Sequence, residues 1–391
     1  PRRLTRGRHD DGAPAWSPNG RRIAFTRGSP SKRDVYLMRA DGAHVRRLTK
    51  LPRGVTSPTW SPDGRRIAFG MGRRGRRAMH VIRSDGRGLR KLTSGAADLR
   101  SIDWQREDPD PLVAAAGDIA CDPGAAAFLG RRRACRQRET SDLLLKMDLS
   151  AVLALGDLQY SDGQLAKFMQ SFHPSWGRLK SLIRPVVGNH EYATPGAAGY
   201  FDYFNGPGQL DGPAGRRGLG YYSYNLGEWH VVALNSICSQ VPGGCAAGSA
   251  QERWLRADLA ANPRPCTLAY WHHPPVSSGA GGTNPELQPL VQALYDHGVD
   301  VLLTGHDHSY ERFAPQDPAG NRDAERGIRQ FIVGSGGRDH RRAVAIQPNS
   351  EVRDDTTFGV LELRLRPHGY FWTFVPERKA GFTDSGANAC H

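Results

Sequence analysis

Five short polar motifs could do chemistry, and each of them directly follows an apolar run. In chain order they are AAAGDIA with Asp118, LALGDLQY with Asp157 and Tyr160, VVGNHEY with Asn189 and His190, LAYWHHPP with His272 and His273, and LLTGHDHSYER with His306 and His308. Most of them have a glycine before the first polar residue, and glycine lets the backbone turn sharply. The pattern therefore predicts polar side chains presented at the ends of buried strands.

The residue types in these motifs are those that bind cations. Asp, Asn, Tyr and His are ligands for hard-to-borderline metal ions, and the set has no thiolate. Seven such side chains suffice for two ions if one carboxylate bridges them, and ions ~3.5–4 Å apart suit in-line attack on phosphorus. Each motif alone has a simpler explanation, since a lone Gly-Asp after a strand is usually a turn. Independent turns would not supply a complete ligand set.

Alternating strands and helices must position these motifs. Apolar runs predict strands at 112–117, 151–156, 184–188, 230–235, 267–271, 299–305 and 329–334, and a more antiparallel end at 358–375. Helices are expected at 141–146, 165–172, 250–260 and 285–297, with Thr140 or Ser141 as the N-cap of the first. This order predicts an α/β domain. Ligand sites in such sheets lie outside the strand ends, where the five motifs gather.

The five motifs resemble those of the calcineurin-like metallophosphoesterases and, within them, the purple acid phosphatases. The family order is GD, GDxxY, GNH[DE], a His motif and GHxH, and all five occur in that order between Asp118 and His308. The wider resemblance runs from about Leu112 to His391. It implies two packed β-sheets flanked by helices over residues 109–391, and a hydrolase acting on phosphoric ester bonds.

The resemblance also implies a metal-ligand set. The first metal would bind Asp118, Asp157, Tyr160 and His308, and the second would bind Asp157, Asn189, His272 and His306, with Asp157 bridging the two. The implied ions are Fe(III) with Zn(II), Fe(II) or Mn(II), and a metal-bound hydroxide would be the nucleophile. Tyr160 indicates the subfamily, because related phosphoesterases commonly lack a tyrosine ligand here and a phenolate suits a ferric ion.

Residues beside the ligands have expected roles on the same basis. His190 would contact the phosphate and donate a proton to the leaving group. Glu191 and Asp307 would orient the ligands. His272 occupies the family's ligand position, although a swap with His273 stays open.

The chain departs from the family in the fourth motif, which reads AYWH where the family often has VxxH, and in the segment that follows it. VSSGAGGTNPELQP at 276–289 contains no histidine, whereas the family usually has substrate-side histidines there. Protonation of the leaving group would then rest on His190 or His273. A packing role for His273, against Trp271 or Pro274, is the alternative.

The first hundred residues contain an internal repeat. WSPNGRRIAF at 16–25 recurs as WSPDGRRIAF at 60–69, a shift of 44 residues. Each period has short strand-like runs bounded by Asn-Gly or Asp-Gly turns, as in a four-stranded propeller blade. The repeat resembles the TolB-type propeller and predicts an all-β partial propeller over 1–108, with a linker at 105–111. Closed propellers have 4–8 blades, so these few repeats favour a fragment of a longer protein over an open stub.

Positive charge is concentrated in this repeat region. Residues 1–108 carry 26 Lys+Arg against 10 Asp+Glu, and the remainder carries 27 against 29. An arginine-rich solvated surface is the simplest interpretation, and an anionic surface polymer is a partner that such a region could bind. The RRGRR run at 73–77 has no interleaved aromatic residues, which argues against nucleic-acid binding.

All six cysteines lie after the repeat, and no CxxC pair occurs. An even number favours disulfides, and the preferred pairing is Cys121–Cys135, Cys238–Cys245 and Cys266–Cys390, one of 15 connectivities. Disulfides form in oxidising compartments, so a secreted, periplasmic or cell-surface location is expected, although no signal peptide is present in the first residues. The longest apolar stretches are far shorter than the ~20 residues of a membrane helix.

Together these features predict a binuclear-metal phosphoesterase that acts on a small phosphate ester. A monoester is favoured by the resemblance, while a diester or nucleotide substrate on the same site stays open. The alternative from another class is a cell-surface binding protein that uses the basic propeller region and whose second domain is an inactive scaffold. The complete ligand set argues against this alternative.

Overall fold

The chain divides into two compact units, Pro1–Glu107 and Asp108–His391. A computed structural model describes residues 4–5, 9–29, 31–62, 64–73, 76–93, 102, 104, 110–126, 128, 135–379 and 381–391. The expected linker at 105–111, apart from its last two residues, lies outside the described residues, as do Arg74 and Gly75 of the basic run.

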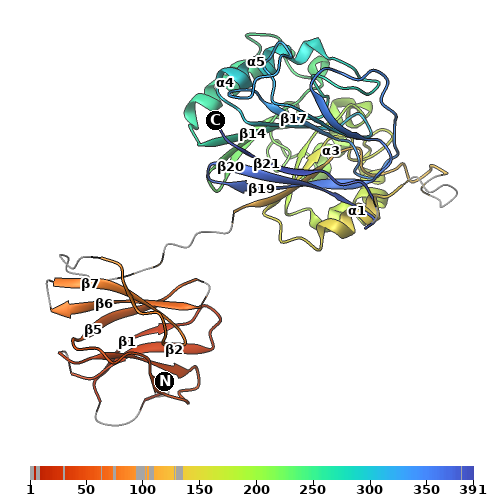
Figure 1. The fold of residues 1–391 in the computed structure, drawn as a ribbon. Helices are drawn as coiled ribbons and strands as arrows, with labels where there is room; N and C mark the ends of the chain where they lie inside the picture. The colour runs from red at the N-terminus through yellow and green to blue at the C-terminus, as the bar shows by residue number, and fades with distance from the viewer. Residues whose placement is uncertain are drawn as a thin grey trace. The chain divides into compact units, whose positions relative to one another are not determined.

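The N-terminal unit contains two four-stranded antiparallel sheets (Figure 1). The first comprises β1 (Asp11–Trp16), β2 (Arg22–Arg27), β3 (Asp34–Arg39) and β4 (Arg46–Arg47), and the second comprises β5 (Val55–Trp60), β6 (Arg66–Arg73), β7 (Arg76–Arg83) and β8 (Arg90–Lys91). The sequence repeat is matched by a repeated hydrogen bond of tryptophan. The indole N–H of Trp60 donates to the carbonyl of Ala15, and that of Trp104 donates to the carbonyl of Thr59, both at 3.1 Å. Trp60 thus joins the second sheet to the first, and Trp104 makes the equivalent contact with the second sheet.

The larger unit is built on two sheets. The six-stranded sheet has the order β11 (Ile183–Val186), β10 (Ala151–Leu155), β9 (Leu112–Ala116), β19 (Gly359–Arg366), β20 (Gly369–Pro376) and β21 (Ser385–Ala389). The seven-stranded sheet has the order β12 (Tyr222–Leu226), β13 (Trp229–Ala233), β14 (Cys266–Tyr270), β15 (Val301–Thr304), β17 (Arg329–Val333), β16 (Tyr310–Phe313) and β18 (Ser350–Asp354). Strands β9 to β11 are mutually parallel, and so are β13, β14, β15 and β17. The carboxyl ends of each parallel set therefore lie at one edge of its sheet.

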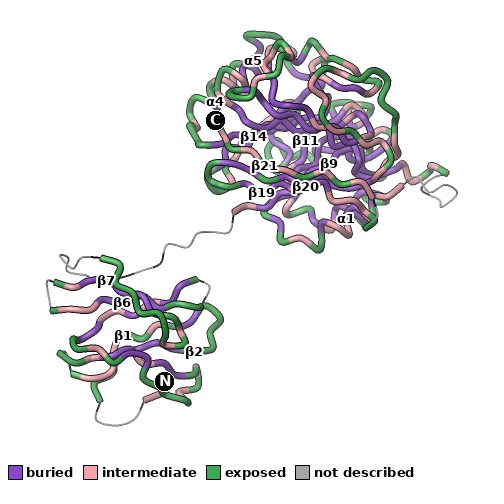
Figure 2. Tube along the Cα trace, viewed as in Figure 1, coloured by how far each residue is buried: buried purple, intermediate pink, exposed green. Residues whose placement is uncertain are grey.

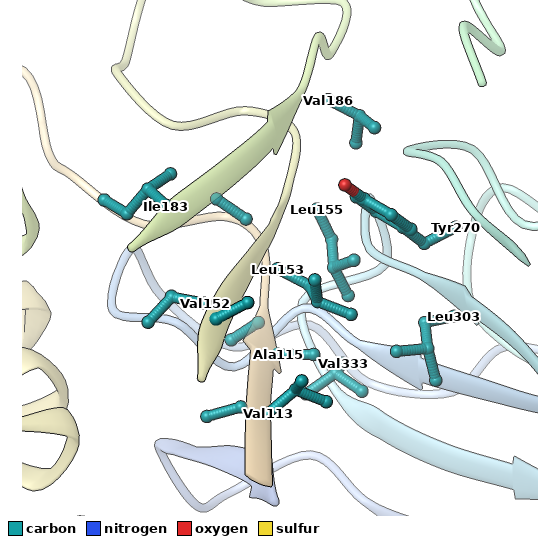
Figure 3. Packing of buried hydrophobic residues seen from close by; sticks show 14 of the residues in the cluster. Val113, Ala115, Val152, Leu153, Leu155, Ile183, Val186, Tyr270, Leu303 and Val333 are labelled. Atoms are coloured by element: carbon teal, nitrogen blue, oxygen red, sulfur yellow. The ribbon is translucent and has the colours of Figure 1, made fainter. Parts of the chain in front are cut away.

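Successive side chains of a strand point to opposite faces of its sheet, and the larger unit has a core on each face of the seven-stranded sheet. In β14, Leu268 and Tyr270 belong to the core between the sheets, together with Leu153 and Val333 (Figure 3). Ala269 points to the other face, where it packs in the core under α4 (Ala250–Ala261) and α5 (Gln288–Asp296). Strands β9 and β14 are buried along their whole length (Figure 2). Burial on both faces explains why these strands appear in the sequence as continuous apolar runs.

The first expected helix is present but begins earlier than predicted, as α1 (Gln137–Leu144). The expectation that Thr140 or Ser141 caps this helix was wrong. The Thr140 hydroxyl donates to the carbonyl of Arg136 at 3.2 Å, and the Ser141 hydroxyl donates to that of Arg138 at 2.9 Å, so both lie inside the helix. Such back-bonding satisfies a hydroxyl within a helix.

The other helices are more segmented than expected. Residues 165–172 form a short α-helix, α2 (Leu165–Lys167), followed by a π-helical turn, and a 3-10 turn precedes α5. Helix α3 (Ala198–Phe204) has no counterpart in the sequence-based expectation. In the described part of the chain, no helix has both the length and the apolar character needed to span a membrane.

Three disulfides link the larger unit, in the preferred pairing of Cys121–Cys135, Cys238–Cys245 and Cys266–Cys390. Cys266 begins β14 and Cys390 follows β21, so the third bridge joins the two sheets across 124 residues of sequence. This bridge also fixes the C-terminal strand.

Candidate metal centre

The seven predicted metal ligands lie just beyond the carboxyl ends of parallel strands. Asp118 follows β9, Asp157 and Tyr160 follow β10, Asn189 follows β11, His272 follows β14, and His306 and His308 follow β15. Three of these strands belong to one sheet and two to the other. Contacts between the ligand side chains show that the two sheets present these ends to each other.

One group of contacts centres on Tyr160. Its hydroxyl lies 2.7 Å from Oδ1 of Asp118, 3.1 Å from Oδ2 of Asp157 and 3.0 Å from Nε2 of His308. His308 Nε2 is also 3.2 Å from Oδ1 of Asp118. None of these four residues is more than 2% exposed. These are the four residues that the resemblance assigns to the first metal.

A second group of contacts centres on His272. Its Nε2 lies 3.1 Å from Oδ1 of Asn189 and 3.3 Å from Oδ2 of Asp157. The imidazole of His306 is next to it, with the two ring centroids 5.1 Å apart. Oδ2 of Asp157 is therefore close both to His272 and to the Tyr160 hydroxyl. This is where a bridging carboxylate would have to lie.

Backbone conformation at the ligands is unusual. Asp118, Asp157 and His306 have left-handed φ angles of 57°, 49° and 71°. A non-glycine residue in this region costs of order 1–3 kcal/mol, and such residues cluster at functional sites. The glycine before Asp157 is needed for a close approach, because a Cβ on Gly156 would lie 2.6 Å from Nδ1 of His272. The backbone is thus strained at three of the predicted ligands, where their side chains are brought together.

The electrostatics of the site favour positive charge. Burial lowers the pKa of His272, but the Asp157 carboxylate outweighs it and raises this pKa to about 9. Asp118 in the same way outweighs burial at His308 and raises its pKa to about 9. Burial and the neighbouring His272 lower the pKa of His306 to about 3. Two buried carboxylates therefore draw positive charge into the cluster.

The residues present fit a pair of metal ions. Ligand atoms of Asp118, Asp157 and His272 lie within 4.8 Å of one another, and so do those of His272, His273 and His306. The donors are carboxylate, phenol, amide and imidazole groups, which suit hard-to-borderline cations. A cation between the two buried carboxylates would relieve their mutual repulsion.

Two buried carboxylates support the ligand loops. The carboxylate of Glu191 accepts hydrogen bonds from the backbone N–H groups of Asp157, Leu158, Gln159 and Gly188, at 2.8–3.1 Å. Burial, together with Asp157, raises the pKa of Glu191 to about 7. Asp307 accepts from the Ser277 hydroxyl and from the N–H of Gly281. It thereby holds the segment that lacks histidines next to His306, a predicted ligand.

The two candidate proton donors differ in exposure and contacts. His190 has a side chain that is 30% exposed, and its ring centroid lies 4.3 Å from that of Tyr160. Its Nδ1 is 2.6 Å from the carbonyl of Ser161, and its Nε2 is 3.8 Å from Asp157. The ring of His273 lies 4.4 Å from that of His306. Because His273 is as near to His306 as His272 is, the choice of His272 as ligand stays a prediction.

Sequence reasoning missed a sixth contribution, from the segment after β17. Oδ1 of Asp339 pairs with Nδ1 of His308, and the Arg338 guanidinium lies 5.0 Å from the centre of the Tyr160 ring. The signal was present in the sequence. GSGGRDH at 334–340 continues an apolar strand with glycine and polar residues, as the five motifs do.

Comparison with known proteins agrees with this geometry. Residues 105–310, more than half of the chain, match the family model of calcineurin-like phosphoesterases. The chain belongs to the calcineurin-like phosphoesterase family. Residues 3–114 match the model of the TolB beta propeller domain. Both resemblances expected from the sequence are thus confirmed.

Several relatives within the family are acid phosphatases. The chain is 30% identical to human acid phosphatase type 7 over 300 residues, which is 70% of this chain and 60% of that protein. It is 28% identical to purple acid phosphatase 21 of Arabidopsis thaliana over 255 residues, 59% of this chain and 54% of that protein. The chain therefore spans little more than half the length of these relatives.

A solved structure shows the same fold. It is that of the purple acid phosphatase PPD1 from yellow lupin seeds, with a TM-score of 0.60 at 17% sequence identity. The likeness covers 97% of this chain and 74% of the lupin protein. The expected α/β metallophosphoesterase fold is confirmed.

Proposed function

We propose that this protein hydrolyses phosphate monoesters at a binuclear metal centre. One observation carries the proposal, which is that ligand-type side chains from five strand ends form two contact groups that share Asp157. Membership of the phosphoesterase family supports the reaction class, and the acid phosphatase relatives favour a monoester over a diester. Phosphodiesters and nucleotides are the competing substrates on the same site.

The ligand set divides as the resemblance implies. Asp118, Asp157, Tyr160 and His308 would hold one ion, and Asp157, Asn189, His272 and His306 would hold the other. The ions we propose are Fe(III) with Zn(II), Fe(II) or Mn(II). Two bound cations would supply a nucleophile from water near neutral pH and would offset the charge of the phosphate.

The protein's own residues would bind and protonate the substrate. His190 is half-exposed beside the ligands, and its Nδ1 is held by the Ser161 carbonyl. This contact directs Nε2 toward the cluster, where a protonated imidazole can bind a phosphate oxygen and give a proton to the leaving oxygen. The absence of histidine from 276–289 makes His190 the main candidate for this role, with His273 as the second.

We also propose that the protein acts outside the reducing cytosol. All three disulfides belong to the unit that carries the site. Cys121 closely follows Asp118, and Cys266 begins β14, the strand that precedes His272. Disulfides persist in secreted, periplasmic and cell-surface proteins.

The decisive experiment is turnover of a chromogenic phosphomonoester by the metal-loaded chain, at acidic and neutral pH. Asp157→Asn should lose activity by on the order of 10²-fold or more, because it removes the charge shared by both ions. Asp148→Asn, an exposed carboxylate outside the site, is the matched control and should leave activity unchanged. Metal analysis should find two ions per chain.

The alternative is a binding protein with an inactive second unit. Wild-type protein with no turnover at any pH tested, together with an identical Asp157→Asn variant, would establish that alternative. Hydrolysis of a diester but of no monoester would instead correct the substrate class while leaving the site intact.

A further inference from the structure

The segment after β17 is fastened to the ligands themselves. The backbone N–H of Arg338 donates to the carbonyl of Asp118 at 2.9 Å, and that of Arg341 donates to the carbonyl of His308 at 3.1 Å. Shortly before Arg338, the N–H of Gly336 donates to the carbonyl of Gly117 at 2.9 Å. The segment is therefore held in a fixed place relative to the first-metal group.

From this place the Arg338 side chain reaches Tyr160. The central carbon of its guanidinium lies 5.0 Å from the ring centre. A cation within ~6 Å of an aromatic ring is attracted to the ring's electrons. On another part of its surface the Tyr160 ring meets His190, at 4.3 Å between centroids. Tyr160 is thus enclosed by contacts to both its ring and its hydroxyl.

Hydrogen bonding alone does not account for the position of Arg338. Its Nη1 pairs with Oδ2 of Asp339 at 3.3 Å, but its Nε is buried without a hydrogen-bond partner among the described residues. The side chain is only 24% exposed. Buried polar groups are normally hydrogen-bonded, so the unpaired Nε is an exception, and the Tyr160 ring is a contact of this guanidinium beside Asp339.

We propose that Arg338 is a positioning residue for Tyr160. It holds the ring in the orientation of a metal ligand, and the positive charge of the guanidinium lowers the energy of the π electrons of the ring. The inference rests on the proposed function, since it takes Tyr160 to be a ligand of the first metal. Two adjacent residues then support two ligands of the same ion. Arg338 contacts the Tyr160 ring, and Asp339 pairs with the His308 imidazole.

The proposal predicts a spectroscopic change. A tyrosine bound to Fe(III) absorbs visible light by transferring charge from the ring to the ion. Removing the cation beside the ring raises the energy of the ring's electrons, so this absorption should move to longer wavelength. Arg338→Met keeps much of the side chain's bulk and removes the charge, whereas Arg338→Lys keeps the charge.

The experiment is the visible spectrum of the full chain loaded with Fe(III). Arg338→Met should shift the band to longer wavelength, and Arg338→Lys should stay near the wild-type position. Arg342→Met is the matched control, because Arg342 is an exposed arginine of the same segment, and its band should not move. If Arg338→Met does not fold, Arg338→Gln is the neutral replacement, with circular dichroism as the check.

The outcomes separate this inference from the proposed function. A coloured wild type whose band is unmoved in the neutral Arg338 variant overturns the role of Arg338 and leaves the metal site in place. An Arg338→Lys shift equal to that of the neutral variant also overturns the charge argument. A colourless wild type with iron bound shows that Tyr160 is not a ligand, and both proposals about this residue then fail.

Discussion

At the scale of single residues, Tyr160 shows how neighbours change the meaning of a side chain. In isolation it would be a packing aromatic whose hydroxyl finds a nearby partner. Here the hydroxyl meets two carboxylates, at 2.7 Å and 3.1 Å. A phenol has one hydrogen to donate, so it cannot satisfy both carboxylates. A cation bound to all three oxygens would resolve this conflict.

The first prediction concerns Tyr160→Phe. The substitution keeps the ring and removes the oxygen, so iron-loaded variant protein should be colourless where the wild type is coloured. Visible absorption with parallel iron analysis is the measurement. A variant that binds two irons and retains the wild-type band would show that the colour arises elsewhere.

The second prediction concerns Asp339→Asn. This carboxylate pairs with Nδ1 of His308 and so fixes the imidazole with Nε2 toward Asp118. Loss of such a partner typically lowers metal affinity by about 10–100-fold. Competition with a chelator measures the change. Asp148→Asn should have wild-type affinity, and equal affinities in both variants would contradict the role of Asp339.

At the scale of elements, the sequence predicted the strand ends well, for a physical reason. A parallel strand buried on both faces needs an uninterrupted apolar run, as LVAAA in β9 and AVLAL in β10 are. The polar residues just after such runs must then leave the core together. The gathering of these side chains was predictable for this reason, and their role as metal ligands stays a prediction.

Other features needed the fold. GSGGRDH follows an apolar strand as the five motifs do, but the sequence does not show that Asp339 pairs with His308 or that Arg338 lies beside the Tyr160 ring. The start of α1 was misplaced because Thr and Ser are good N-caps in general. Only the fold shows that the Thr140 hydroxyl lies 2.6 Å from the carbonyl of Gly336 as well, which places it within the helix and against the site segment.

The third prediction belongs to the loops that carry the ligands. Oε1 of Glu191 accepts from Leu158 and Gln159, while Oε2 accepts from Asp157 and Gly188. In Glu191→Gln an amide NH₂ replaces one oxygen, so two buried N–H groups lose their acceptor. At about 1–3 kcal/mol for each of the two unsatisfied groups, the free energy of unfolding should fall by about 2–6 kcal/mol.

Urea unfolding of the full chain measures this change. Glu286→Gln is the control, because Glu286 is exposed at the start of the turn before α5. Surface changes of this kind are usually within about 0.5 kcal/mol. A Glu191→Gln variant as stable as this control would show that the four hydrogen bonds are dispensable.

At the scale of the whole molecule, the two units differ in what stabilises their folds. The N-terminal unit buries a small core between repeat strands, including Trp60, Ile67 and Phe69, and the described cysteines all lie outside it. The larger unit combines two cores with three disulfides. Reductant should therefore act on the unit that carries the candidate metal centre.

The fourth prediction compares two of these disulfides. A bridge stabilises mainly by restricting the unfolded chain, and the effect grows with the loop that it closes. Cys266–Cys390 spans 124 residues and Cys238–Cys245 spans 7. In the chain-entropy model these loops correspond to about 5 and about 2 kcal/mol at 25 °C. The Cys266→Ser/Cys390→Ser double variant should therefore lose more stability than Cys238→Ser/Cys245→Ser.

The long bridge has a second effect that the loop argument omits, because it joins β14 of one sheet to the end of β21 in the other. Without it the two sheets are held together by packed side chains and by hydrogen bonds such as that from the Trp229 indole to the carbonyl of Arg366. The predicted ligands come from strand ends of both sheets. Calorimetry of both double variants, with metal analysis after mild heating, separates these effects. If the variant without the long bridge loses metal below its unfolding temperature while the other variant does not, the bridge maintains the site as well as the fold. Equal losses of stability and of metal in the two variants would contradict both expectations.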